Sequence, residues 1–166
     1  MSRLDDWAPH ELGAFLAAVR GTRLQAAWHL AAAAGLRTGE LLALRWADVD
    51  LDRARLDVRT AVVGVPYAAM KPPPTSSWSR TVKLDPLTHA ILREHGSRQQ
   101  AERSEWGSHY RDRGLVVCRE NGEPLHPRSL CSAFARAVAE SGLPPIGLSA
   151  LRRSDVPRTV QYVGAA

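Results

Sequence analysis

The chain has 166 residues, 45% of them hydrophobic, which predicts one folded domain with a buried core and excludes a disordered tail. Its net charge is +5, and Lys71 and Lys83 are the only lysines among 22 basic residues. Arginine makes paired contacts with phosphate or carboxylate groups, so nucleic acid is the first partner to consider, although the codon usage of a GC-rich genome would enrich arginine as well.

Three helices are predicted in the first third of the chain. Apolar residues at helical spacing indicate a first helix that opens at Pro9 and a second over residues 24–34, with Gly35 as a natural C-terminal stop. Thr38 can then cap a short third helix. Arg37 is therefore expected in a tight joint between two buried helices, where its charge is costly to bury without an anionic partner.

Residues 49–84 are predicted to form a small antiparallel sheet. Apolar and charged residues alternate over residues 56–60, which is the two-residue period of a strand, and RTVKL at 80–84 has the same character. The stretch MKPPPTSSWS at 70–79 cannot form a helix interior because of its prolines, so it is expected to be a loop with Lys71 beside it.

The second half is predicted to be mostly helical. A helix begins near Leu87 and continues into a polar run at 97–113, which is interpreted as its solvated end, with contact to backbone phosphates as the lesser alternative. The elements that follow are a short buried strand LVVC, a turn at Asn121-Gly122, a helix opened by Pro127 and closed by Gly142, and a short buried helix at 148–151.

Four stretches together resemble one known family. They are GLRTGELLALRWADVDL at 35–51, SRTVKLDP at 79–86, NGEPLHPRSLCSAF at 121–134 and GLPPIGLSALRRS at 142–154. Their order resembles the catalytic domain of tyrosine recombinases, the phage-integrase family. The resemblance implies that residues 1–166 form an α+β domain that is mostly helical, with a small antiparallel three-stranded sheet.

The resemblance also implies a chemistry. In the family, a tyrosine hydroxyl attacks a DNA phosphodiester, forms a 3′-phosphotyrosine and frees a 5′-hydroxyl, without metal or cofactor. Charge builds on the non-bridging oxygens, and preorganised cations stabilise it. By the resemblance, Arg37 and Arg152 are the two arginines that clamp the phosphate, Lys71 protonates the leaving oxygen and Glu40 steadies the neighbourhood of Arg37. These basic residues and Arg153 are the expected contacts to double-stranded DNA.

The sequence also departs from the family pattern. Ser149 stands where the family has a histidine, and serine cannot shuttle a proton near pH 7. The later Leu-Gly-His box, the usual nucleophile segment and the N-terminal core-binding domain are not found in the sequence. Tyr162 follows Arg152 too closely, in a tail with little to anchor it, and is not expected to be the nucleophile. The expected protein is a truncated, catalytically incomplete member that binds DNA, with a second copy or a full-length recombinase as a further candidate partner.

Simpler interpretations of the arginines remain open. Arg37 could be a structural arginine paired with Glu40 or Asp48, and Arg152 a surface arginine on a basic tail. The box around Arg37 favours the phosphate clamp, and the adjacent Arg153 and the lost histidine make the assignment of Arg152 weaker.

Other single residues have ordinary explanations. Lys83 is the alternative to Lys71, although it lies inside a predicted strand. His29, among apolar helix residues, is expected to be a core histidine. Cys118 and Cys131 lack metal-binding spacing and are interpreted as free thiols of a cytoplasmic protein. No apolar run spans a bilayer, and no signal peptide is present.

A helix-turn-helix regulator is the alternative function. Ala31-x-x-x-Gly35 followed by TGELLALRW at 38–46 has the spacing of that motif. A recognition helix, however, carries polar side chains that read bases. This one offers Leu41, Leu42, Leu44 and Trp46.

Overall fold

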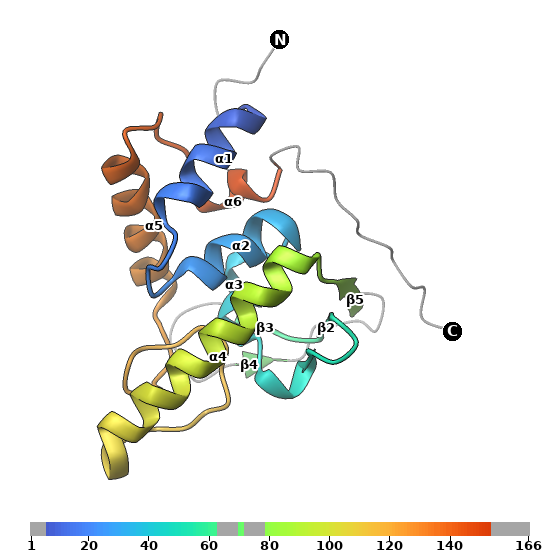
Figure 1. The fold of residues 1–166 in the computed structure, drawn as a ribbon, viewed down its shortest axis with the longest axis vertical. Coiled ribbons are helices and arrows are strands. Elements are labelled where there is room, and N and C mark those ends of the chain that lie inside the picture. The colour runs from blue at the N-terminus through green and yellow to red at the C-terminus, as the bar shows by residue number, and fades with distance from the viewer. Residues whose placement is uncertain (1–5, 63–69, 72–78, 154–166) are drawn as a thin grey trace.

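The computed structural model describes residues 6–153 except 63–69 and 72–78, and at Met70–Lys71 it describes the backbone only. Figure 1 shows the arrangement of the elements. In chain order, they are α1 (Pro9–Ala18), α2 (Gln25–Ala33), α3 (Thr38–Ala43), η1 (Trp46–Asp48), β1 (Val49–Asp50), β2 (Arg55–Val58), β3 (Ala61–Val62), β4 (Met70–Lys71), β5 (Arg80–Lys83), α4 (Pro86–Trp106), η3 (Gly107–His109), α5 (Pro127–Ser141) and α6 (Leu148–Leu151).

The α2 helix lies at the centre of the helical part. Its residues from Ala26 to Ala32 are all buried, and it contacts α1, α3, α4 and α6. Gly35 ends this helix with a φ of +67°, a left-handed conformation that glycine adopts without strain. The next helix begins at Thr38, and Arg37 is its N-cap. The prediction that Thr38 caps α3 was therefore wrong by one residue.

The strands form two separate antiparallel ladders. The three-stranded sheet has the order β1-β2-β5, in which Leu56 pairs with Val82 and both side chains are fully buried. The second ladder joins β3 to β4, with Ala61 opposite Lys71. The three-stranded antiparallel sheet is confirmed. Of the stretch at 70–79 that was expected to be a loop, Met70–Lys71 form strand β4, and residues 72–78 lie outside the described part of the structure.

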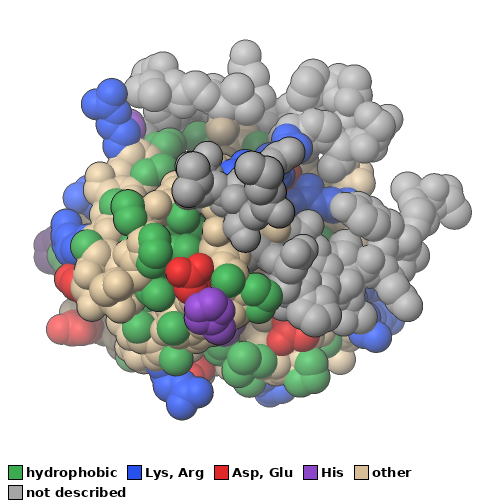
Figure 2. Space-filling model, turned by 90° about the horizontal axis from the view of Figure 1, so that it is seen from above, with side chains coloured by type: hydrophobic (Ala, Val, Ile, Leu, Met, Phe, Trp, Pro, Cys, Tyr) green, Lys and Arg blue, Asp and Glu red, His purple; other side chains and the backbone are tan. Residues whose placement is uncertain are grey.

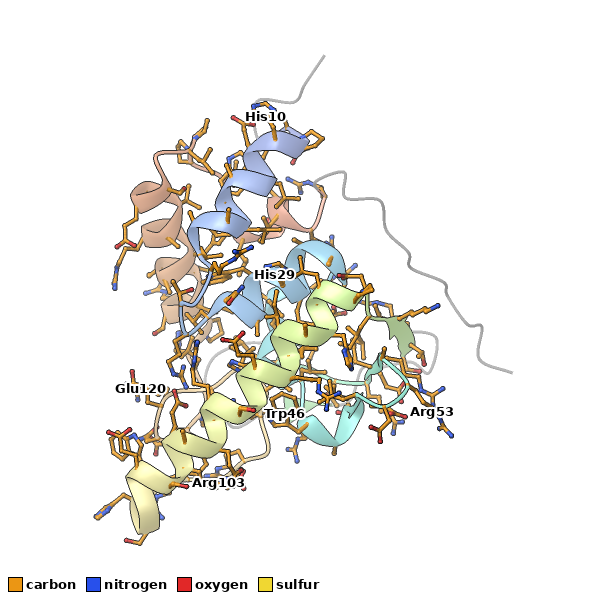
Figure 3. The ribbon with its side chains drawn as sticks, in the orientation of Figure 1. His10, His29, Trp46, Arg53, Arg103 and Glu120 are labelled. Atoms are coloured by element: carbon orange, nitrogen blue, oxygen red, sulfur yellow. The ribbon has the colours of Figure 1, made fainter. Side chains whose placement is uncertain are left out.

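The long α4 helix crosses the front of the molecule in Figure 1. The Asp85 carboxylate caps it by accepting hydrogen bonds from two backbone N–H groups of the first turn. In its middle, the Gln99 amide accepts from Trp46 Nε1 at 2.7 Å and donates to the Val116 carbonyl at 2.7 Å. Trp46 is labelled in Figure 3. These bonds tie α4 to residues 115–118, which are buried as predicted but make only one isolated bridge, Leu115 with Arg45.

Aromatic rings join the N-terminal helices to α5. Phe134 lies 5.4 Å from Phe15, 5.3 Å from Trp28 and 6.3 Å from Trp7, measured between ring centroids. The predicted helix from Pro127 is confirmed, and Gly142 ends it with a φ of +70°. The cluster forms the centre of the core between α1, α2 and α5.

The predicted fold class is confirmed, because the molecule is mostly helical with a small three-stranded antiparallel sheet. His29 is 4% exposed, as expected for a core histidine. Both Cys118, which is buried, and Cys131, which is exposed, are free thiols. Within the described parts of the chain, no helix is both long and apolar enough to cross a membrane.

Candidate functional site

Arg37 lies at the start of α3, where the chain turns out of α2. The backbone at Arg37 is extended, with φ −76° and ψ 159°. This turn buries Leu36, which is 2% exposed, and leaves the Arg37 side chain exposed. The expectation that Arg37 is buried between two helices was wrong, because the turn directs successive side chains to opposite sides.

Glu40, one turn further on, is the buried charge of this region. Its side chain is 2% exposed. The Arg80 guanidinium donates to both carboxylate oxygens, to Oε1 at 2.9 Å and to Oε2 at 2.8 Å. The backbone N–H of Arg37 donates to Oε2 at 2.8 Å. Glu40 therefore contacts Arg37 through the main chain, and its ion pair is with Arg80 on strand β5.

The electrostatics of Glu40 follow from these contacts. Burial alone would raise the pKa of its carboxyl group. The hydrogen bonds and positive charge of Arg80, with the Arg37 amide, outweigh burial and hold this pKa below its ordinary value. The carboxylate is thus ionised at neutral pH and remains an acceptor for the start of α3.

Sequence reasoning missed Arg80, although a signal was present. Side chains alternate between the two faces of a strand, so Arg80 lies on the same face of β5 as Val82, which is fully buried. An arginine on the core-facing side of a strand predicts a buried carboxylate partner. Glu40, already singled out in the stretch at 35–51, is that partner.

Lys71 comes close to α3 through the β3–β4 ladder. Lys71 pairs with Ala61, and the neighbouring Val62 packs on α3 so closely that a Cβ at Gly39 would lie 2.6 Å from the Val62 carbonyl oxygen. The side chain of Lys71 lies outside the described part of the structure. Its rival, Lys83, is exposed and lies on the face of β5 opposite to Arg80.

Arg152 follows the short α6 helix, which packs on α2. Its side chain is half-buried, and its Cγ lies 3.7 Å from the position that a Cβ at Gly35 would take. Arg152 therefore lies over the turn that leads to Arg37. The adjacent Arg153 is exposed and forms an ion pair with Asp6, with Nε 3.3 Å from Oδ1. The two arginines thus have different surroundings.

Ser149 is exposed in α6, three residues before Arg152. Residues three apart in a helix lie on the same side, so Ser149 and Arg152 share one side of α6. Tyr162 lies outside the described residues. The structure thus brings Arg37, Arg152 and the backbone of Lys71 around the N-terminal turn of α3.

On the face seen in Figure 2, Lys and Arg side chains stand mainly near the edges, with hydrophobic and acidic side chains between them. A hollow at the C-terminal end of α4 carries Glu102, Glu105 and Glu120, and Figure 3 shows Glu120 near this end. Glu102 is paired with Arg23, but Glu105 and Glu120 add negative charge that repels a phosphate, so that hollow does not suit nucleic acid. Among described residues, no cluster of His, Cys, Asp and Glu could hold a metal.

The model of the phage integrase family matches residues 7–155. The chain belongs to the phage integrase family. It is 28% identical to a XerC-like tyrosine recombinase of Caldanaerobacter subterraneus subsp. tengcongensis, over 92% of this chain and 42% of that protein. It is 32% identical to the prophage integrase IntR of Escherichia coli K12, over 84% of this chain and 36% of that protein. The chain thus spans less than half the length of these relatives.

The fold of this phage integrase family member agrees with solved structures. The Tn1549 transposon integrase in complex with transposon right end DNA superposes with a TM-score of 0.77, at 16% identity, over 93% of this chain and 52% of that one. The helix-turn-helix alternative is not favoured. Leu41, Leu42 and Leu44 are buried in the core and are not available to read bases.

Proposed function

We propose that this chain binds double-stranded DNA through its phosphates and forms the phosphate-holding part of a site-specific recombinase. The contact between Arg152 and the Gly35 position carries the proposal, because it brings Arg152 to the turn that presents Arg37. Two guanidinium groups that lie beside the same turn can hold the non-bridging oxygens of one phosphate through paired donors. The Tn1549 integrase, which has this fold, was solved bound to DNA.

In the proposed site, each residue has one role. Arg37 and Arg152 hold the phosphate and stabilise the charge of the transition state. Lys71, on the β3–β4 ladder beside α3, donates a proton to the leaving 5′-oxygen. Glu40 keeps the start of α3 in place, and Arg153, beside Arg152, adds a contact to the DNA backbone. Chemistry of this kind proceeds without metal or cofactor.

Ser149 limits what the site does alone. It occupies the place of the family's histidine, and general acid–base catalysis by such a group typically contributes about 10²–10⁴ in rate. The proposed activity of the 166-residue chain is therefore DNA binding without strand cleavage. A second copy or a longer recombinase on the same DNA is the proposed protein partner.

DNA binding is tested by fluorescence anisotropy with a labelled duplex over a range of salt concentrations. The expected result is weak binding with little sequence preference, which falls steeply with salt because phosphate contacts dominate. The variants R37A and R152A should each weaken binding by about tenfold and lower the salt slope by about 1.

The matched control is R53A, because Arg53 is an exposed arginine that forms a loose pair with Asp50 at 3.8 Å. It removes the same charge away from α3 and should change the affinity by less than about twofold. Equal losses in all three variants would mean that only net charge matters. Tight, sequence-selective and salt-insensitive binding would contradict the proposal.

A further inference from the structure

The Glu40–Arg80 pair, like Arg23–Glu102 beside α4, is an ion pair of the described residues in which both groups are largely withdrawn from water. The Glu40 side chain is 2% exposed and that of Arg80 is 22% exposed, whereas most other ion pairs among the described residues lie at the surface. Removing charges from water costs free energy, and apolar residues of similar size often replace a buried pair with no loss of stability. Stability alone does not explain the pair.

The geometry of the pair gives another reason for it. The two donors of Arg80 fix both oxygens of the Glu40 carboxylate, at 2.9 and 2.8 Å, so that the carboxylate cannot rotate. One of these oxygens also accepts the Arg37 N–H at 2.8 Å. Two parallel hydrogen bonds from Arg80 to Glu40, and one from the Arg37 N–H to Glu40, therefore connect strand β5 to the backbone of Arg37.

The same turn is held from a second side by the β3–β4 ladder. Val62 of β3 lies against Gly39, and β4 carries Lys71. The first turn of α3 is thus held by backbone packing on the side of the Lys71 ladder and by an ion pair on the side of the three-stranded sheet. Among the described residues, Arg80 connects that sheet to the backbone of Arg37 through the Glu40 carboxylate.

We propose that Arg80 is a positioning residue for phosphate binding: by fixing the Glu40 carboxylate, it sets the backbone orientation from which Arg37 reaches the phosphate. This inference rests on the proposed function. Arg80 itself is engaged with Glu40 and acts through Arg37, so its contribution depends on the presence of the Arg37 side chain. A residue that only stabilised the fold would not show this dependence.

The test is a double-mutant cycle on DNA affinity with the full chain. In E40M/R80M, two apolar side chains of similar length replace the pair, and the unfolding midpoint should stay within a few degrees of the parent. DNA affinity should nevertheless fall by about fivefold, because the start of α3 has lost its acceptor. In the R37A background, the same double substitution should cost less than about twofold.

The matched control is the pair Arg103–Asp112, which is 2.9 Å apart at the far end of α4. R103M/D112N also removes one charge of each sign and should leave DNA affinity unchanged in both backgrounds. R80K keeps the charge but lacks the fork that binds both oxygens, and it should retain part of the affinity. If E40M/R80M does not fold, R80K replaces it in the cycle and is measured in the parent and in the R37A background. The expected loss of DNA affinity in the parent is then smaller, about threefold.

The possible outcomes separate the two proposals. If R37A does not weaken DNA binding, the proposed function is wrong. If R37A weakens binding but loss of the pair does not, Arg80 is not a positioning residue. A loss of equal size with and without the Arg37 side chain would also overturn the inference, since it would mean that the pair acts only on folding or on net charge.

Discussion

Gly39 lies so close to strand β3 that the Val62 carbonyl oxygen would be 2.6 Å from a Cβ atom at this position. The neighbour is backbone and cannot move aside cheaply. G39A should therefore lower the free energy of unfolding by about 1–3 kcal/mol, as overpacking does. This clash outweighs the gain of up to about 1 kcal/mol that alanine brings to a helix. Urea unfolding measures the change.

The matched control for G39A is Gly13 in α1, which is exposed and where an added Cβ would meet no other atom within 4 Å. Here only the helix propensity changes, so G13A should raise the free energy of unfolding by about 0.5–1 kcal/mol. A stabilising G39A, or equal effects of the two substitutions, would show that α3 does not pack on β3 as described.

Stability should fall as the pH drops below neutrality. Burial lowers the pKa of His29 and of His95, so both are neutral in the folded protein at neutral pH. Below the ordinary histidine pKa of about 6.5, the unfolded chain binds protons that the folded chain does not. The free energy of unfolding therefore decreases as the pH falls, by at most about 1.4 kcal/mol per pH unit for each histidine, until the folded groups also titrate.

Urea unfolding between pH 7.5 and pH 5.5 checks this prediction. H29L removes one buried histidine and should make stability less dependent on pH in this window. H10L replaces an exposed histidine of α1 and serves as the control. Identical pH profiles for H29L and the parent would contradict the account of His29.

Asp85 should contribute measurably through its cap on α4. Its Oδ1 accepts from the backbone N–H groups of Leu87 and Thr88, each at 3.0 Å. D85A leaves these groups without the acceptor and should cost about 0.5–2 kcal/mol of unfolding free energy, while D85N should retain most of the stability. Thermal unfolding of the three proteins makes the comparison. A D85A variant as stable as the parent would rule out a role for this cap.

The chain alone should not form a covalent bond with DNA. In the proposed site, Ser149 takes the position where a proton-shuttling histidine is expected, and a hydroxyl group cannot take that role near pH 7. A nicked DNA substrate that traps the covalent intermediate, analysed on a denaturing gel, should give no protein–DNA band with the 166-residue chain. A band that disappears in Y162F would instead identify Tyr162 as the nucleophile.

The sequence predicted best where local rules act. Both ends of helix α5 were predicted correctly because Pro127 and Gly142 have strong conformational preferences of their own, and its apolar stripe faces the core. Arg37 was misjudged because the apolar residues on both sides predicted burial, whereas a single turn at Gly35 sends its side chain outward. Turn geometry of this kind depends on packing that a local pattern does not contain.

The Arg80–Glu40 pair could not be found by local rules because it joins a strand to a distant helix. The sequence indicates that each of the two residues lies on a buried face. That they pair with each other follows only from the packing of the sheet on α3. Residues 115–118 show the same limit. Their burial was predicted, yet they form a single bridge and no full strand. The Val116 carbonyl oxygen is instead hydrogen-bonded to the side chains of Gln99 and His95 of α4.

The two ends of the described chain meet at one corner of the molecule, at the top of Figure 1. Trp7 donates from Nε1 to the Pro144 carbonyl at 2.9 Å, and Asp6 pairs with Arg153. Polypeptide attached before residue 6 and polypeptide attached after residue 153 would therefore leave from neighbouring points. A short linker could join these two points, so the domain is a good candidate for circular permutation with new ends in an exposed loop.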